Sequence, residues 1–172
     1  MTQRPVVVWG NCQAEPIARL LAEPLRRHGL QVVDVPPVFL VDDTGLERVH
    51  ELVSRAAALL TQPVREEYRI PGCGAAQLSA MLPADGRCLT FPVTYHVGAF
   101  PFQVNAHGGE GERVDAPLTD YHDLRTLVAA SRGMTVEETV AWWPMPPAEA
   151  VRRASEESLG RLREREAPLD VS

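Results

Sequence analysis

Apolar and polar residues along the first 96 positions predict strands and helices in turn. A short apolar run over residues 5–9 ends at Gly10, and a helical pattern with one apolar side follows over residues 14–27. Further strands are expected at 31–41, 58–62 and 87–93, and further helices at 46–57 and 72–82. Repeated strand–helix alternation is typical of a parallel sheet with crossover helices.

Local breakers and caps set the expected limits of the second strand and the helix after it. Pro36 and Pro37 interrupt the 31–41 strand, because proline cannot donate a ladder hydrogen bond. Asp43 or Thr44 is expected to cap the helix that follows.

The C-terminal part of the sequence lacks the strand–helix alternation of the first part. Residues 97–119 are rich in Gly and Pro and are expected to form a long loop or lid. From Asp120 onward only helices are expected, over 124–131, 135–143 and 148–166. The last of these has a thin apolar side and many charges, which favours a solvated surface helix.

Together these elements predict an α/β fold. We expect an open, mostly parallel sheet of four or five strands flanked by helices, with a helical C-terminal third. A chain of 172 residues is long enough for one substantial core and short for two. We therefore expect a single domain over 1–172, with a sheet part at 1–96, a loop or lid at 97–119 and a helical part at 120–172.

Composition and charge limit the classes of partner that we expect for this chain. The net charge of −6 lacks the basic footprint of a nucleic-acid binder. No apolar run approaches the roughly 20 residues that span a bilayer, and we expect no signal peptide before the first strand. Three cysteines, an odd number, indicate reduced thiols and a cytoplasmic setting. All 17 basic residues are Arg, so phosphate binding would depend on guanidinium or backbone N–H groups.

The turn after the first strand carries the clearest chemistry. Gly10, Asn11, Cys12 and Gln13 lie where a strand ends and a helix begins, and the free N–H groups of a helix start favour thiolates and other anions. A thiolate with a nearby His could carry out acyl transfer, with Asn11 and Gln13 as oxyanion donors. The turn could equally bind a phosphate or pantetheine with Cys12 only nearby, or Cys12 could simply fill space.

Other candidates follow from topology. The ends of parallel strands meet at one sheet edge, which would bring Gln62, Tyr95 and His96 near Cys12. Asp120 is expected to cap a helix, leaving His122 or Asp123 as a base or an orienting carboxylate. Arg65 or Arg69, just past the third strand, could reach phosphates.

Several common motifs are absent. Arg19 stands one place too late for a Cys-x5-Arg phosphatase loop, and Gly10 alone does not make a dinucleotide fingerprint. The sequence has neither a P-loop nor a Gly-x-Ser-x-Gly elbow, and its Cys and His spacing is not that of structural zinc. No metal site is expected.

The sequence resembles the WcbI-like polysaccharide biosynthesis proteins. The blocks that carry the resemblance occur in the family's order and span nearly the whole chain. They are Gly10-Asn11-Cys12-Gln13-Ala14, Gln62-Pro63, Phe91-Pro92, Tyr95, Gly98, Pro101, Tyr121-His122-Asp123, Gly133-Met134-Thr135-Val136-Glu137-Glu138, Glu157-Ser158-Leu159 and Arg163-Glu164-Arg165-Glu166. The Gly-Asn-Cys-Gln turn is the most specific of them. The family pattern continues into an Asn-His-Pro segment past the point where this chain stops, at Ser172, so we expect a C-terminally short member.

The resemblance implies coenzyme A binding and acetyl transfer to sugars, with acetyl-coenzyme A as substrate. It places Cys12 and Gln13 in the active-site turn, and Gln62, Tyr95 and His122 near the pocket. We expect the catalytic residues to be Cys12, His122, Asp123 and His96. We expect the cofactor-binding residues to be Gly10, Asn11, Gln13, Gln62, Arg65, Tyr95 and Tyr121.

The leading hypothesis is thus an acyltransferase that uses a small-molecule acyl donor and a hydroxyl acceptor in polysaccharide or natural-product biosynthesis. Two alternatives stay open: a thioesterase-like or SGNH-like hydrolase using Cys12, and a non-catalytic coenzyme A-binding or scaffold protein. No nucleic acid and no membrane span are expected, and a homo-oligomer is compatible with the thin-faced last helix.

Overall fold

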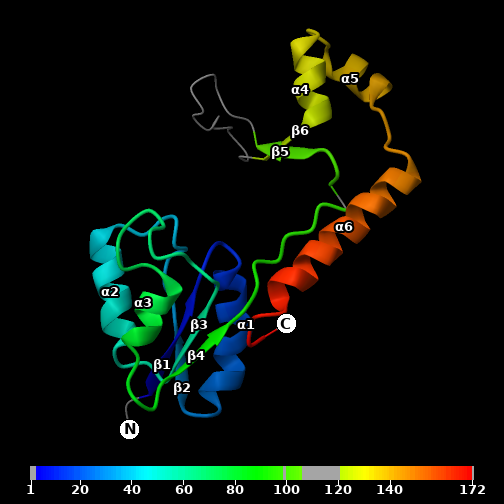
Figure 1. Cartoon of the computed structure of the whole chain (residues 1–172). Coiled ribbons are helices and arrows are strands. Elements are labelled where there is room, and N and C mark those ends of the chain that lie inside the picture. Colours follow the sequence, from blue (N-terminus) through cyan, green and yellow to red (C-terminus); the bar gives the residue numbers. More distant parts are fainter. Residues whose placement is uncertain (1–2, 99, 106–120, 172) are drawn as a thin grey trace. The chain divides into compact units, whose positions relative to one another are not determined.

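The computed structural model describes residues 3–98, 100–105 and 121–171. The chain divides into two compact units (Figure 1). One, the sheet unit, comprises residues 1–94 together with 162–172; the other, the hairpin unit, comprises residues 95–161. We describe each unit by itself.

A four-stranded parallel sheet forms the centre of the sheet unit. Its strands are β1 (Arg4–Trp9), β2 (Leu30–Val33), β3 (Ala58–Thr61) and β4 (Arg87–Thr90), in the order β2-β1-β3-β4. All three strand pairs are parallel, and Val7 of β1 pairs with Val33 on one side and Leu59 on the other. The predicted α/β fold with an open, mostly parallel sheet is confirmed.

Helices cover both faces of this sheet (Figure 1). On one face, α2 (Asp43–Val53) and α3 (Ala75–Ala80) contribute Val49, Val53 and Leu78 to a large apolar cluster around Trp9 and Leu59. On the other face, α1 (Ala14–Arg26) packs Ile17 and Leu21 against Val8 and Phe91. The cap of α2 is Asp42, whose carboxylate accepts from the Gly45 N–H at 2.7 Å, so the predicted cap at Asp43 or Thr44 is wrong by one or two residues.

The 31–41 segment is a strand only as far as Val33. Beyond it, Val35, Val38 and Val41 are buried as an irregular segment. Pro36 and Pro37 have no N–H for a sheet ladder, yet the apolar side chains around them still pack into the core. The prediction of a strand reaching residue 41 is therefore wrong, although its apolar residues are core residues.

The fourth strand is also shorter than predicted, ending at Thr90 rather than Val93. The chain after α6 supports its edge. The Asp170 carboxylate accepts from the Thr90 N–H at 2.9 Å and from its hydroxyl at 2.8 Å. These bonds hold the pKa of Asp170 below its usual range. The Val171 N–H donates to Thr90 O.

The hairpin unit begins with two short antiparallel strands, β5 (Gln103–Asn105) and β6 (Tyr121–Asp123). Both correct the predictions. A strand occupies part of the expected 97–119 loop, of which residues 106–119 lie outside the described residues. The first helix of this unit lies at the expected residues 124–131, but its cap is not Asp120, which is outside the described residues, because residues 121–123 pair with 103–105 as a strand. Asp123, whose carboxylate accepts from the Arg125 N–H, is the cap.

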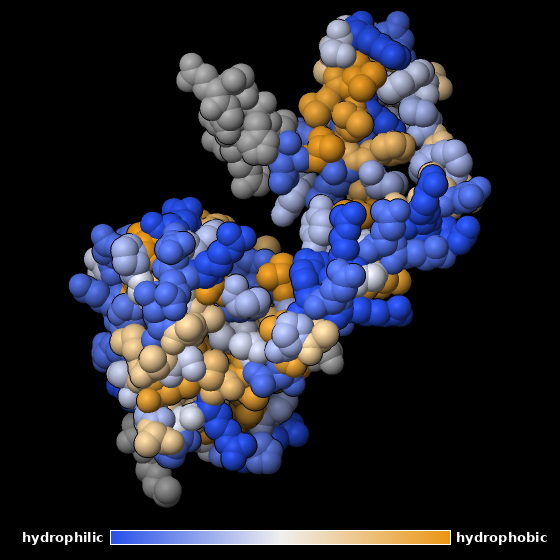
Figure 2. All heavy atoms as spheres, viewed as in Figure 1, coloured by the Kyte–Doolittle hydropathy of each residue, from blue (hydrophilic) through white to orange (hydrophobic). Residues whose placement is uncertain are grey.

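Three helices complete the hairpin unit and the connection that follows it, close to their predicted positions. They are α4 (Leu124–Ser131), α5 (Val136–Trp142) and α6 (Ala148–Glu166). Thr135 and Glu138 form a reciprocal capping box at the start of α5. Figure 2 shows hydrophobic side chains gathered over α4 and a largely hydrophilic α6, which fits the predicted surface helix. Within the described residues, no helix is long and apolar enough to cross a membrane.

Candidate functional site

The Gly10–Gln13 turn is closed by its own side chains. The Asn11 Oδ1 accepts from the Gln13 N–H at 2.9 Å, and the Asn11 carbonyl accepts from the Ala14 N–H at 2.9 Å. Cys12 is an exposed free thiol in this turn. Among the described residues, the backbone N–H groups of Cys12 and Glu15 have no acceptor. The turn therefore presents a thiol beside two unpaired donors at a helix start.

Two side-chain amides hold the turn against the neighbouring strand ends; we call Gln13 and Gln62 the amide clamp. Gln62 is buried, and its Oε1 accepts from the Asn11 N–H at 2.8 Å while its Nε2 donates to Gln13 Oε1 at 3.0 Å. The Gln13 amide in turn pairs with both the N–H and the carbonyl of Thr94. The clamp thus joins the ends of β1 and β3 to the segment after β4.

Gly10 is required by this arrangement. A Cβ at position 10 would lie 2.4 Å from Gln62 Oε1, which is closer than any real contact. Gly10 is therefore a close-approach residue that admits the clamp, a role distinct from direct ligand contact. Its predicted contact with coenzyme A stays a prediction.

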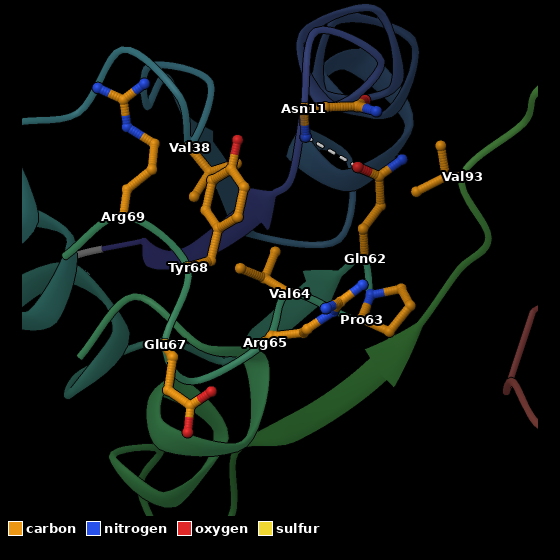
Figure 3. Close-up of a pocket in the computed structure, with 10 residues that line it drawn as sticks. All are labelled: Asn11, Val38, Gln62, Pro63, Val64, Arg65, Glu67, Tyr68, Arg69 and Val93. Carbon is orange, nitrogen blue, oxygen red and sulfur yellow. Dashed lines mark hydrogen bonds between the residues drawn. The ribbon is translucent and has the colours of Figure 1, made fainter. Parts of the chain in front are cut away.

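A cavity of about 660 Å³ opens beside the turn (Figure 3). It lies at the carboxyl ends of β1 and β3, where the chain leaves β1 toward one neighbour first and later returns to the other. Open α/β sheets bind ligands at this switch point. The lining residues are Asn11, Val38, Gln62, Pro63, Val64, Arg65, Glu67, Tyr68, Arg69 and Val93.

Hydrogen bonds from buried and half-buried side chains fix the loop that forms one wall of the cavity. The buried Cys73 thiol donates to Tyr68 O, and the buried Trp9 indole donates to Cys73 O at 2.9 Å. His50 Nε2 lies 2.9 Å from Gly72 O. Arg69 has a φ of 56°, a left-handed backbone that side-chain-bearing residues rarely adopt. Such strain persists where the surroundings fix it, and it is common at binding sites.

The cavity carries a net positive charge. Arg65 and Arg69 form no ion pair with any carboxylate in the described part of the chain. In Figure 3 their guanidinium groups lie on different sides of the Tyr68 ring, and the Glu67 carboxylate points away from it. Two free guanidinium forks beside an aromatic ring suit an anionic ligand with a planar or apolar part.

The other predicted residues belong to the hairpin unit. His122 and Asp123 are half-buried neighbours on β6, but successive side chains of a strand point to opposite faces. Register places Gln103 opposite Asp123 and Val104 opposite His122. The structure therefore does not pair the His122 ring with the Asp123 carboxylate. His122 Nε2 is buried and lacks a hydrogen-bond partner in the described structure.

Asp123 has a different partner. Its two carboxylate oxygens accept from Arg125 Nε at 2.9 Å and Nη2 at 2.6 Å. These bonds hold the pKa of Asp123 below its usual range, and the helix N-cap bond adds to the effect. The Arg125 guanidinium lies over the rings of Phe102 and Trp143, 4.6 and 4.1 Å from their centroids. The catalytic roles predicted for His122 and Asp123 stay predictions.

His96 and Tyr95 lie on the segment next to α6. His96 Nε2 is 3.0 Å from Ser155 Oγ, and the Val97 N–H donates to the buried Ser158 Oγ at 3.1 Å. The Tyr95 side chain is about half exposed. His96 thus has a serine partner on a helix, and its predicted catalytic role also stays a prediction.

A smaller cavity of about 270 Å³ lies in the hairpin unit. It is lined by Phe100, Gln103, Tyr121, His122 and Asp123. Within the described residues, no cluster of His, Cys, Asp and Glu could hold a metal ion.

Sequence reasoning missed several of these residues. Tyr68 follows two glutamates in a charged segment just past a strand end. That position at the carboxyl edge of the sheet could have indicated a cavity-lining residue. Phe100 and Gln103 fall in a segment expected to be a loop. No local pattern marks Arg125, because its partners Phe102 and Trp143 lie 23 and 18 residues away in sequence.

Fold and site together define a parallel α/β protein with a cavity at the switch point of its sheet. The family model of the polysaccharide biosynthesis enzyme WcbI matches residues 5–172. The chain therefore belongs to the WcbI family, as its sequence motifs indicate. No curated protein matches the chain.

A solved structure has the same fold. It is described as WcbI, a novel polysaccharide biosynthesis enzyme, in its native form without a disulfide bond between coenzyme A and a cysteine. The two chains superpose with a TM-score of 0.75 at 20% sequence identity. The superposition covers 95% of this chain and 53% of the other, so this chain spans about half the length of that relative.

Proposed function

We propose that this chain binds coenzyme A at the carboxyl edge of its sheet and transfers an acyl group to a sugar hydroxyl. The observation that carries the proposal is the cavity of about 660 Å³ next to the exposed thiol turn, lined by two arginines that have no ion pair with any described residue. Family membership and the coenzyme A named for the solved relative support the choice of ligand.

The residues present fit coenzyme A by chemistry. Arg65 and Arg69 supply guanidinium forks for its phosphates, and the Tyr68 ring supplies an aromatic face for its adenine. The Asn11 side chain, which lines the cavity, supplies its amide N–H groups as donors for a pantetheine chain running toward Cys12, while the amide clamp fixes the turn that carries them. The cavity lies within the roughly 300–1,000 Å³ typical of small-molecule sites.

Acyl-coenzyme A supplies an activated thioester: transfer forms a C–O ester bond, breaks the C–S bond and moves the acceptor's hydroxyl proton to the departing sulfur. Cys12 either takes the acyl group first, its thiol proton leaving with coenzyme A, or only lies beside the thioester. The N–H groups of Cys12 and Glu15 are the candidate oxyanion donors. His122 or His96 is the candidate base for the acceptor hydroxyl.

Calorimetric titration with coenzyme A tests the binding. We expect saturable heat from the wild type, and a Kd about tenfold higher for Arg65→Ala and for Arg69→Ala, because each loses a charge-assisted hydrogen bond. Arg55→Ala is the matched control, since it removes the same charge from an exposed residue outside the cavity. Absence of heat with the wild type would exclude coenzyme A as the ligand.

Mass spectrometry separates the two roles of Cys12. After incubation with acetyl-coenzyme A, an acetyl adduct on Cys12 that is absent from Cys12→Ser indicates covalent catalysis. A Cys12→Ser protein that binds coenzyme A normally and retains full turnover makes the thiol a bystander.

A further inference from the structure

The cavity of the hairpin unit differs in chemistry from the cavity of the sheet unit. Its volume of about 270 Å³ is below the range for drug-sized ligands, which suits a single ring better than a nucleotide. Of its lining residues, Phe100 and Tyr121 are large aromatic side chains with 67% and 51% of their surface exposed. Exposed aromatic faces beside polar groups are typical of binding surfaces.

Polar groups stand beside these rings. In the antiparallel register, Gln103 is opposite Asp123, and Tyr121 lies two residues before Asp123 on the same strand face. One face of the hairpin therefore carries an amide, a carboxylate and a phenol together. Amide and carboxylate groups hydrogen-bond vicinal hydroxyls, and an aromatic ring packs against the C–H face of a pyranose.

The cavity also has no uncompensated charge among its described lining residues. Asp123 is the charged one, and the Arg125 guanidinium neutralises it through two hydrogen bonds. Arg125 is itself held between two rings and is not a lining residue. Among the described residues that line this cavity, no guanidinium is therefore free for a phosphate or a uronate, in contrast to Arg65 and Arg69 in the sheet unit. The compensated carboxylate can still accept hydrogen bonds from hydroxyl groups.

We infer that the hairpin cavity binds one uncharged sugar residue, with Phe100 and Tyr121 as stacking faces and Gln103 and Asp123 as hydroxyl partners. The assignment of this sugar as the acyl acceptor rests on the proposed function, whereas the binding itself does not. It moves Tyr121 from the coenzyme A ligands, where the sequence placed it, to the sugar ligands.

Saturation-transfer NMR titration of the full chain with a panel of neutral methyl hexopyranosides tests the inference. Each glycoside is paired with its methyl uronoside, which differs by one carboxylate. We expect saturable binding of at least one neutral glycoside with a Kd on the order of 1 mM, and weaker binding of its uronoside because the described lining residues offer no guanidinium to pair with its carboxylate.

Substitutions localise the binding. Phe100→Ala and Tyr121→Ala are expected to weaken the neutral glycoside about tenfold. Phe100→Trp keeps an aromatic face and should retain binding, which separates stacking from folding. Val136→Ala, on the exposed surface of α5 and outside the cavity, is the control. Circular dichroism verifies that each variant is folded.

Three outcomes would overturn the inference: no neutral glycoside binds, the uronosides bind more tightly than their neutral counterparts, or both alanine variants bind like the wild type. A parallel coenzyme A titration keeps the two proposals apart. Loss of sugar binding with coenzyme A binding intact defeats this inference alone, and the reverse result defeats the proposed function alone.

Discussion

Each unit of the chain is stabilised by a different kind of internal interaction. The sheet unit buries thirteen side chains in one apolar cluster that includes Trp9 and Leu59. In the described hairpin unit, only Gly98, Ala129 and Ser158 are buried. There, the Arg125 guanidinium contacts the Phe102 ring just before β5, the Asp123 carboxylate of β6, and the Trp143 ring and Pro144 O after α5.

This difference explains why the two cavities differ in charge. The sheet-unit cavity lies on strand ends fixed by a large core, so its strained Arg69 and its amide clamp can be maintained. The hairpin cavity lies beside the Arg125 cluster, in which the guanidinium is already paired with the Asp123 carboxylate. Among the described residues, the first cavity therefore has arginines without an ion pair in its lining and the second has none.

The largest expected effect tests the apolar core of the sheet unit. Leu59→Ala should lower the free energy of unfolding by about 3 kcal/mol, because it leaves a hole beside fully buried neighbours. Leu20→Ala, at a residue 77% exposed on α1, should change it by less than about 0.5 kcal/mol. Urea unfolding followed by far-UV circular dichroism measures both. Equal effects would contradict the assigned core.

The next effect tests the Arg125 cluster. Arg125→Ala should destabilise the hairpin unit by about 2 kcal/mol, since it removes two cation–π contacts and leaves Asp123 half-buried without its partner. Arg125→Lys should restore only part of this, because an ammonium cannot stack and pair bidentately at once. Arg152→Ala, in an exposed pair with Glu156, is the control. Hydrogen exchange of α4 and α5 amides is the measurement, and unchanged protection in Arg125→Ala would refute the role.

A smaller effect tests the close approach at Gly10. Gly10→Ala should destabilise the sheet unit by about 1 kcal/mol and weaken coenzyme A binding, because the new Cβ displaces Gln62 from Asn11. Gly160→Ala is the matched control: it lies in mid-helix with nothing near its Cβ and should stabilise by roughly 0.5–1 kcal/mol. Thermal unfolding and calorimetry would detect the opposite signs, and a stabilising Gly10→Ala would contradict the clamp.

The smallest effect is a pH dependence confined to the hairpin unit. The pKa of Asp123 is lower in the folded state, so its contribution to stability is full above its unfolded pKa of about 3.9 and is lost as the pH falls through the lowered value. Hydrogen exchange of the hairpin unit should therefore accelerate in acid below about pH 4. Asp123→Asn should flatten this dependence. A variant with the same acid response as the wild type would show that another carboxylate is responsible.

Much of the fold was predictable because its signals are local. Hydrophobic periodicity located β1, β3 and the helices α1, α4 and α6 nearly to the residue. The limits that failed were those set by tertiary context: β2 stops at Val33 although apolar residues continue, and residues 121–123 extend along β5 instead of opening a helix. Pairing between distant segments leaves no periodic signal in either one.

The candidate site divides in the same way. The Gly-Asn-Cys-Gln turn was recognisable from its residues, and its place at a strand–helix junction is confirmed. The partnership of Gln62 with this turn across 51 positions was predicted only as proximity. The side chains Tyr68 and Phe100 were missed, because exposure and facing are properties of the folded chain.

By itself, the sequence determined the parallel α/β class, the thiol turn and the family, since strand–helix periodicity and a short motif are both written in consecutive residues. Only the tertiary structure decided that Gly10 gives Gln62 room to approach, and that Asp123 pairs with Arg125 and not with His122. It also decided that Arg65 and Arg69 have no ion-pair partner in the described part of the chain. Those outcomes depend on which charged and polar groups come into contact although they are far apart in sequence. Strand register and the space left by neighbouring side chains decide which of these contacts form.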